Sequence, residues 1–388
     1  MKHTTPLSLL AAGLLTAGTA QAADEDLRRE IESLKQENKV IMERLNATSE
    51  MIENNQAKAG KSPVSIGGYG ELHYNNLDNQ LAGGDDKEML DFHRFVLFFG
   101  YEYTDDIRFF SELEIEHAVA GDGQPGEVEL EQAYVEFDLN DHTSAKGGMF
   151  LLPVGILNET HEPPTFYGVE RNPVEKNIIP TTWWAAGAEL TGRFGQGFSY
   201  NLGVHEGLKV DPTGNMAVRG GRQKSAEADA YDLATTARIK YTGIPGLELA
   251  ATVQYQSDMS QDSSDNLGSG NLIETHAIYT HGAFGLRALY ATWDLDGDAP
   301  AATGANEQTG WYIEPSYKLN NQWGVFARYN QWDNNAGLNN DTEYSQVDVG
   351  LNYWPHEDVV IKFDLQDQDA PVGSDEYDGF NIGIGYQF

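Results

Sequence analysis

Phe380-Asn381-Ile382-Gly383-Ile384-Gly385-Tyr386-Gln387-Phe388 ends the chain, and its large apolar residues alternate strictly with small or polar ones. A period of two is typical of a β-strand whose two faces meet different surroundings. In a soluble barrel the apolar face would point inward, whereas in a membrane barrel it points outward to lipid and the lumen is polar. The stretch therefore predicts a strand and leaves two kinds of barrel to be told apart.

Charged residues in other strand-like segments separate these two kinds. The face opposite the apolar one carries Lys362 and Asp364 in segment 359–365, and Glu112 and Glu114 in another segment. Unpaired charges are costly in a dry core, but they cost little beside a water-filled channel. We therefore expect the apolar face to meet lipid and the charged face to line a lumen.

The connections between these segments alternate in length. Short turns are expected at 104–106, 140–142, 195–197, 242–246, 281–283, 320–321 and 355–357, and long polar loops at 75–88, 118–126, 153–181, 207–229, 258–270, 294–307, 333–342 and 369–377. Such sorting is expected when one barrel end faces the periplasm and the other faces the outside. We predict an all-β fold, a 16-stranded antiparallel transmembrane β-barrel over 62–388, preceded by an N-terminal α-helical coiled coil.

The first 61 residues differ in character from the rest. Lys2, an apolar run over 7–20 and the ending Ala20-Gln21-Ala22 predict a secretory signal peptide at 1–22. Residues 24–60, a helix and linker, carry a narrow heptad seam of Leu27, Ile31, Leu34, Asn38, Ile41, Leu45 and Ile52. A narrow seam favours partner helices, and a polar Asn in it helps to fix their register. We predict a periplasmic coiled coil, the alternative being one amphipathic helix docked on the barrel.

Composition and motifs exclude several classes of function. The net charge is −35, which argues against nucleic acid as a partner. The chain has no cysteine, and it has no HExxH, GxSxG or GxxxxGK[ST] motif. The acidic run at 294–298 lacks the Gly and Glu that a calcium loop needs further along. We therefore predict no catalytic residue, no metal and no cofactor.

Four motifs make the chain resemble a known family. They are Ile66-Gly67-Gly68-Tyr69-Gly70-Glu71-Leu72, Phe92-His93-Arg94-Phe95, Glu131-Gln132-Ala133-Tyr134-Val135-Glu136-Phe137, and Lys146-Gly147-Gly148-Met149-Phe150 leading to Pro153-Val154-Gly155. The chain resembles the phosphate-selective (polyphosphate) porins of Gram-negative outer membranes, and its N-terminal segment is similar to the coiled coil of dicarboxylate-permeable relatives. The resemblance implies a homotrimer with one pore in each barrel. Phosphate-specific members are rich in basic lumen residues, whereas this chain is strongly acidic, so phosphate specificity is not carried over.

The third long loop is the candidate pore constriction. Five prolines between 153 and 180 interrupt it, so it is not expected to be a strand. In the sixteen-stranded porins that the chain resembles, this loop folds into the lumen. The residues predicted to narrow the pore are Glu159, His161, Glu162, Glu170, Arg171, Glu175 and Lys176. The alternative is an exposed surface loop.

Charged residues of the inner wall are expected to oppose this loop. By strand parity they are Arg94, Arg108, Lys146, Arg193, Arg238, Arg287, Arg328 and Lys362, with Glu112 and Glu114. Facing charges in a narrow pore set ion selectivity. The alternative is that each basic side chain pairs with an acidic neighbour on the wall.

Aromatic residues gather near the ends of the predicted strands. They are Tyr101, Tyr103, Trp183, Trp184, Tyr241, Trp293, Trp311, Tyr312, Trp323, Trp332, Tyr353 and Trp354. Their placement predicts two girdles at the membrane interfaces.

Taken together, these features predict a passive diffusion channel of a Gram-negative outer membrane, for small hydrophilic or charged solutes that include phosphate or dicarboxylate anions. The expected partners are two further copies of the chain, outer-membrane lipid and lipopolysaccharide, and the barrel-assembly machinery, for which Tyr386 and Phe388 form the C-terminal signal. Peptidoglycan is a further candidate partner. The alternatives are a structural or tethering barrel and, less favoured, a barrel hydrolase.

Overall fold

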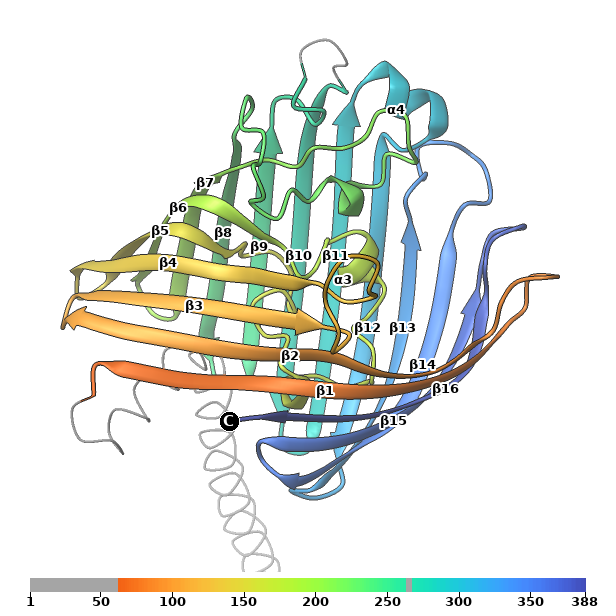
Figure 1. Cartoon of the computed structure of the whole chain (residues 1–388), viewed down its shortest axis with the longest axis horizontal. Helices are drawn as coiled ribbons and strands as arrows, with labels where there is room; N and C mark the ends of the chain where they lie inside the picture. The colour runs from red at the N-terminus through yellow and green to blue at the C-terminus, as the bar shows by residue number, and fades with distance from the viewer. Residues whose placement is uncertain (1–61, 263–266) are drawn as a thin grey trace, which may run out of the picture.

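The computed structural model describes residues 62–262 and 267–388, and these residues form a closed barrel of sixteen antiparallel strands (Figure 1). The strands are β1 (Val64–Asn79), β2 (Lys87–Thr104), β3 (Ile107–Glu116), β4 (Val128–Asn140), β5 (Thr143–Leu151), β6 (Trp184–Phe194), β7 (Phe198–His205), β8 (Ala234–Ile244), β9 (Leu247–Gln256), β10 (Ser269–His281), β11 (Phe284–Asp296), β12 (Glu307–Lys318), β13 (Trp323–Asp333), β14 (Tyr344–His356), β15 (Val359–Asp369) and β16 (Tyr377–Gln387). The predicted barrel is confirmed. The predicted signal peptide and coiled-coil seam lie outside the described residues.

The barrel closes between the C-terminal stretch and the first strand. In the antiparallel register of β16 against β1, Ile382 lies opposite Tyr74 and Ile384 lies opposite Leu72. The last residue extends this ladder, because the backbone N–H of Phe388 donates to the carbonyl of Gly68 at 2.9 Å and the carbonyl of Phe388 accepts from the N–H of Gly68 at 3.0 Å. Closure therefore leaves neither β1 nor β16 as a free edge, which is the condition for a sheet to sit in lipid.

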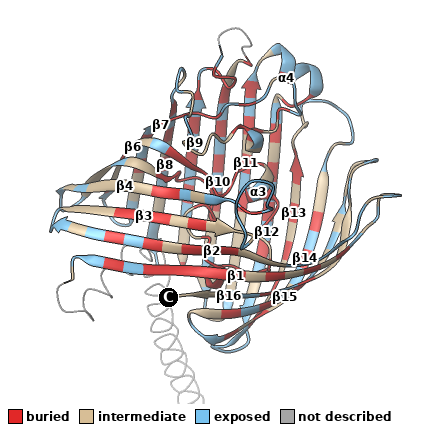
Figure 2. Cartoon of the chain, viewed as in Figure 1, coloured by how far each residue is buried: buried red, intermediate tan, exposed pale blue. Residues whose placement is uncertain are grey.

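The two faces of each strand differ in exposure as the period of two predicts. In β16 the side chains of Ile382 and Ile384 are 41% and 40% exposed, whereas Asn381 and Gly383, which alternate with them, are buried. The same alternation of buried and exposed residues runs along much of β9, β10, β12 and β15 (Figure 2). The apolar face points outward and the polar face inward, so the direction inferred from the mid-strand charges is confirmed.

The connections keep the predicted alternation of short turns and long loops. Residues 141–142 join β4 to β5, and residues 282–283 join β10 to β11. Several strands run further than expected: β1 continues to Asn79 and β11 to Asp296. Polar residues such as Asn75 fall within an expected loop, but they are compatible with a strand whose inner face is polar.

Part of the predicted aromatic girdle is wrong. Six of the named residues are buried within the molecule: Trp183, Trp184, Trp293, Tyr312, Trp332 and Trp354. Trp183 and Trp293 pack against each other with ring centroids 6.1 Å apart, and the indole N–H of Trp293 donates to the carbonyl of Ile178 at 3.0 Å. They serve the packing of inserted loops, whereas Tyr101, Tyr103, Trp311 and Trp323 remain exposed on the outer face.

Two connections fold into the barrel rather than away from it. The first, residues 152–183, contains the 3-10 helix η1 (Pro163–Thr165) and the helix α3 (Val174–Asn177), and α3 lies inside the ring of strands in Figure 1. The second, residues 206–233, contains the 3-10 helix η2 (Val218–Gly221), which contacts α3. We call them the third loop and the fourth loop. Elsewhere, α4 (Asp298–Thr303) lies in the loop after β11.

Candidate functional site

The third loop is packed against the inner wall by its apolar residues. Val154, Val174, Ile178 and Ile179 are fully buried and belong to one hydrophobic cluster with wall residues such as Leu289. Of the helices in this loop, η1 contacts β1, β15 and β16, and α3 contacts β12 and β13. The loop therefore crosses the lumen from its origin at β5 and β6 to the opposite wall.

Basic side chains of the wall hold the backbone of this loop in place. Arg287 Nη2 donates to the carbonyl of Thr165 at 2.8 Å, and Lys362 Nζ donates to the carbonyl of Gly168 at 2.8 Å. Because the loop has little regular structure, its carbonyl groups need partners from outside it. These wall cations supply them.

Arg328 and Arg238 also link the wall to the loop, and both carry acidic partners. Arg328 forms ion pairs with Glu314 at 3.1 Å and Asp348 at 3.0 Å, and it donates to the Tyr167 carbonyl at 3.4 Å. Arg238 is paired with Glu159 of the loop itself. The predicted opposition of wall and loop charges is thus realised as direct contact.

The other predicted wall cations pair mainly with acidic neighbours on the wall. Arg94 contacts Glu71 at 2.7 Å and Glu114 at 3.2 Å, and Lys146 contacts Glu189 at 2.9 Å. Near the short turns, Arg108 pairs with Glu136 and Asp138, while Arg193 is exposed. Arg238 and Arg328 therefore contact the third loop, as the first interpretation predicts. Arg94 and Lys146 pair with acids of the wall, as the alternative predicts.

Glu175 is the acidic residue that connects separate parts of the third loop. Glu175 is fully buried, and its Oε2 accepts from the backbone N–H groups of Ile156 at 2.9 Å and Leu157 at 2.6 Å. Its Oε1 accepts from Tyr312 at 2.8 Å and from Asn172 at 3.2 Å. Glu175 therefore connects the start of the loop, Asn172 and strand β12.

Among the other charged residues of the third loop, His161 approaches two carboxylates of the wall. His161 Nε2 lies 3.4 Å from Glu112 and 3.7 Å from Glu131, all three being buried. His161 Nδ1 lies 3.1 Å from the carbonyl of Asn158. Glu162 is buried nearby, and in the described part of the chain its Oε2 has no hydrogen-bond partner. Glu170 contacts His73 at 3.0 Å.

A group of three arginines, two of which sequence reasoning missed, lies where the third and fourth loops meet. Arg219 Nη1 donates to the carbonyls of Lys176 and Thr181, each at 2.8 Å. Arg222 Nη1 donates to the carbonyl of Thr182 at 2.6 Å, and Arg171 Nη1 donates to its hydroxyl at 2.6 Å. We call Arg171, Arg219 and Arg222 the arginine group. Among the described residues, Nε and Nη2 of Arg171 and Nε of Arg222 are buried without a hydrogen-bond partner.

The fourth loop carried a signal that the sequence reading did not use. Leu208, Val210, Met216 and Val218 are buried in the same cluster as the third loop. Apolar residues repeated in a loop of otherwise polar character indicate that the loop is covered, and their spacing could have suggested an inserted segment.

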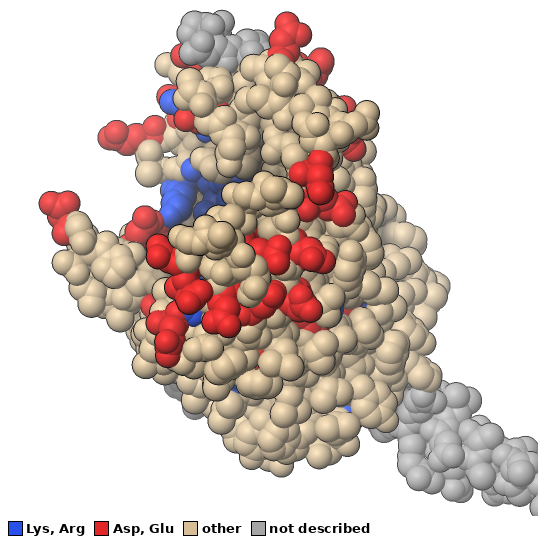
Figure 3. All heavy atoms as spheres, turned by 90° about the vertical axis from the view of Figure 1, so that its right-hand side faces the viewer, with Lys and Arg blue, Asp and Glu red and all other residues tan. Residues whose placement is uncertain are grey.

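A cavity of about 250 Å³ lies beside the third loop, between it and strands β8 to β12. Its charged lining includes Arg238, Lys240, Arg287 and Lys318, against the acids Glu159 and Glu248. At the surface, acidic side chains surround a hollow in which basic side chains are visible (Figure 3). The lining of this cavity is thus less acidic than the chain as a whole.

None of the helices in the described residues is long and apolar enough to span a membrane.

Comparison with known proteins agrees with this architecture. A protein of Aquifex aeolicus (strain VF5), named as uncharacterized, is 32% identical over 359 residues, covering 84% of this chain and 80% of its own. The outer membrane channel DcaP of Acinetobacter baumannii has a TM-score of 0.58 at 16% identity, covering 84% of this chain and 97% of its own.

Two further solved structures share the fold. An anion-selective porin from Comamonas acidovorans gives a TM-score of 0.59 at 13% identity, covering 84% of this chain and 100% of its own. The trimer form of OmpT of Vibrio cholerae gives 0.54 at 13% identity, covering 84% and 99%. The family described as phosphate-selective porin O and P matches residues 64–388. This chain therefore belongs to the phosphate-selective porin O and P family and is an outer-membrane channel for small solutes.

Proposed function

We propose that this channel conducts small anions by passive electrodiffusion, without a chemical step, and that the arginine group selects them. The observation that carries the proposal is the convergence of three guanidinium groups, two of which, those of Arg171 and Arg222, have buried nitrogen atoms without a hydrogen-bond partner among the described residues. Guanidinium donors match the paired oxygen atoms of carboxylate and phosphate. A permeating anion of either kind would be attracted by the positive charge of these guanidinium groups.

The electrostatic environment of the arginine group also favours anions. Burial, followed by the neighbouring charges of Arg222 and Arg171, lowers the pKa of the Arg219 guanidinium, as expected where positive charge is not fully compensated. Inner-wall acids such as Glu71 and Glu189 are already paired with cations. The net charge of −35 therefore does not require a cation-selective constriction.

Reversal potentials across a salt gradient test the proposal. Full-length protein in a planar bilayer should give an anion-biased reversal potential with KCl, and phosphate or a dicarboxylate should reduce the chloride current. The double variant Arg219→Gln/Arg222→Gln should shift the reversal potential toward cations. The matched control is the double variant Lys209→Gln/Arg193→Gln, which removes the same amount of charge from exposed positions.

Two outcomes would contradict this assignment. A cation-biased wild-type channel would show that acidic groups govern permeation. An equal shift in both double variants would show that total charge, rather than the arginine group, sets selectivity.

We further propose that the protein is a homotrimer whose residues 24–60 form a periplasmic coiled coil. The trimer form of a structural neighbour and the seam from Leu27 to Ile52 support this assembly. Deleting residues 24–60 should leave single-channel conductance unchanged and reduce the stability of the trimer in detergent. Loss of conductance in correctly folded barrels would contradict this division of labour.

A further inference from the structure

We propose that a cluster of histidines on the lumen wall binds a divalent transition-metal cation of the Zn²⁺ class. The cluster consists of His73, Asp91, His93, His117 and Glu170, which we call the histidine cluster. It goes beyond the conduction of anions, because its ligands are imidazole nitrogen and carboxylate oxygen atoms, the donors that Zn²⁺, Ni²⁺ and Cu²⁺ take in proteins.

Two histidines converge on one carboxylate oxygen. Oδ2 of Asp91 lies 2.9 Å from Nδ1 of His93 and 2.8 Å from Nδ1 of His117. The two rings are nearly perpendicular, at 81°, with centroids 5.3 Å apart. One ligand atom from each of these three residues lies within 4.8 Å of the other two. Metal–nitrogen bonds of about 2.0–2.1 Å require only a modest closing of this group.

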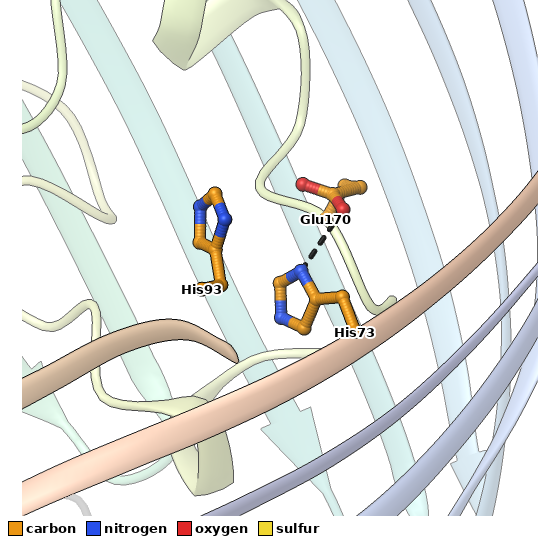
Figure 4. Close-up of side chains that lie close together, drawn as sticks. All are labelled: His73, His93 and Glu170. Atoms are coloured by element: carbon orange, nitrogen blue, oxygen red, sulfur yellow. Dashed lines mark hydrogen bonds and ion pairs between the residues drawn. The ribbon is translucent and has the colours of Figure 1, made fainter. Parts of the chain in front are cut away.

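A second triad shares the His93 ring. Figure 4 shows His73, His93 and Glu170 close together, and one ligand atom from each lies within 4.8 Å of the others. The rings of His73 and His93 stack at 4.7 Å and 15°. His73 Nδ1 lies 3.0 Å from Glu170, while its Nε2 lies 3.1 Å from Glu71. A carboxylate behind a ligating histidine fixes its tautomer and raises its basicity.

The fold itself brings these residues together. Asp91 of β2 is opposite His73 of β1, next to a register shift between Glu71 and His73, and the ring of His93 contacts Asp91 and stacks on His73. The backbone N–H of His117 donates to the carbonyl of His93 at 3.1 Å, and His117 has a φ of 51°. A left-handed conformation is uncommon for a residue other than glycine and is often found at functional sites.

Accessibility distinguishes this cluster from another group of similar composition. The side chains of Asp91, His93 and His117 are 18%, 25% and 33% exposed, so a cation in the lumen can reach them. Glu112, Glu131 and His161 form a triad too, but all are at most 3% exposed. Glu170 belongs to the third loop, so a bound metal would also join that loop to the wall.

Metal binding by full-length protein, purified without a histidine tag, tests the proposal. Isothermal titration with ZnCl2 should show a site that EDTA empties, and Co²⁺ should give a visible ligand-field absorption band. His93→Ala removes the residue shared by both triads and should weaken binding at least 100-fold. Asp91→Asn keeps the shape of the side chain and should weaken binding about tenfold or more.

The control is another group of possible metal ligands, which lies at the surface. His356, Glu357 and Asp358 also lie within ligand distance of one another, on an exposed turn. His356→Ala should leave the affinity and the Co²⁺ band unchanged. Absence of Zn²⁺ binding to the wild type, binding kept in His93→Ala, or binding lost in His356→Ala would each overturn the proposal. These measurements do not depend on conduction, so their failure is distinct from failure of the anion-channel proposal.

Discussion

Glu175 is the residue whose removal should loosen the third loop most clearly. Its carboxylate accepts four hydrogen bonds, two from backbone N–H groups at the start of the loop and one each from Asn172 and Tyr312. The variant Glu175→Ala leaves all four donors without this acceptor. The loop remains covalently joined to β5 and β6, so the barrel itself should still form.

The magnitude follows from the number of bonds. At about 1 kcal/mol for each buried hydrogen bond, the gross loss is about 4 kcal/mol. Removing a buried carboxylate recovers about 1–2 kcal/mol of its desolvation cost. The net destabilisation of the closed loop is therefore about 2–3 kcal/mol. Since 1.4 kcal/mol corresponds to a factor of ten, the open population should rise roughly 30- to 140-fold.

Amide hydrogen exchange in detergent micelles measures this opening. The N–H groups of Ile156 and Leu157 lose their acceptor and should exchange faster by that factor, because exchange of protected amides reports local opening. Amides in the centre of β12 should keep their wild-type rates. Single-channel records of the variant should show added current noise from the mobile loop.

Glu162→Ala is the matched control. It removes the same side chain from the same loop at similar burial, but Oε2 of Glu162 has no hydrogen-bond partner in the described part of the structure. It should change exchange at Ile156 and Leu157 by less than tenfold. Equal acceleration in both variants would refute the reasoning, because volume and charge alone would then explain the effect.

Three further changes test other contacts. Arg328→Ala leaves the buried carboxylates of Glu314 and Asp348 without their cation, so the free energy of unfolding measured in urea should fall by about 3–5 kcal/mol. Arg193→Ala, at the exposed end of β6, should lower it by less than about 0.5 kcal/mol. Lys362→Met removes the bond to the Gly168 carbonyl and should increase exchange of the loop amides near it, with little change in barrel stability. Phe388→Ser keeps the backbone ladder to Gly68 but removes the C-terminal aromatic ring, so the amount of folded protein in the outer membrane should fall several-fold while refolding in detergent is retained.

The strand pattern was readable from the sequence because a membrane barrel imposes one rule on every residue of every strand. Ile382 and Ile384 must face lipid, and Asn381 must face the lumen, whatever the neighbouring strands contain. The short turns were equally readable, since chain reversal in two or three residues needs particular residue types. Both features are local, and both were predicted within a few residues.

The contacts inside the barrel were less predictable, because they depend on the path of the inserted loops. Strand parity placed Arg287 and Lys362 on the inner wall, but it could not show that their partners are carbonyl groups of the third loop. The same limit explains the tryptophans: Trp293 lies near a strand end, as a girdle residue would, yet it faces a loop that arrives from another part of the chain. Arg219 and Arg222 were missed for this reason as well.

The net charge is a poor guide to selectivity in this molecule, because selectivity depends on where the unpaired charges lie and not on their total. Along the inner wall, acids such as Glu71, Glu189 and Asp348 each have a basic partner, and those ion pairs contribute little net field to a passing ion. Basic residues such as Arg328 both neutralise acids and hold the third loop, so changing them would alter selectivity and pore shape together. Arg219 and Arg222 differ in having no ion-pair partner among the described residues, and both donate to backbone carbonyls of the third loop. Their replacement by glutamine removes charge without leaving a buried carboxylate unpaired and keeps an N–H donor in the side chain, which makes them the decisive positions for the sign of selectivity.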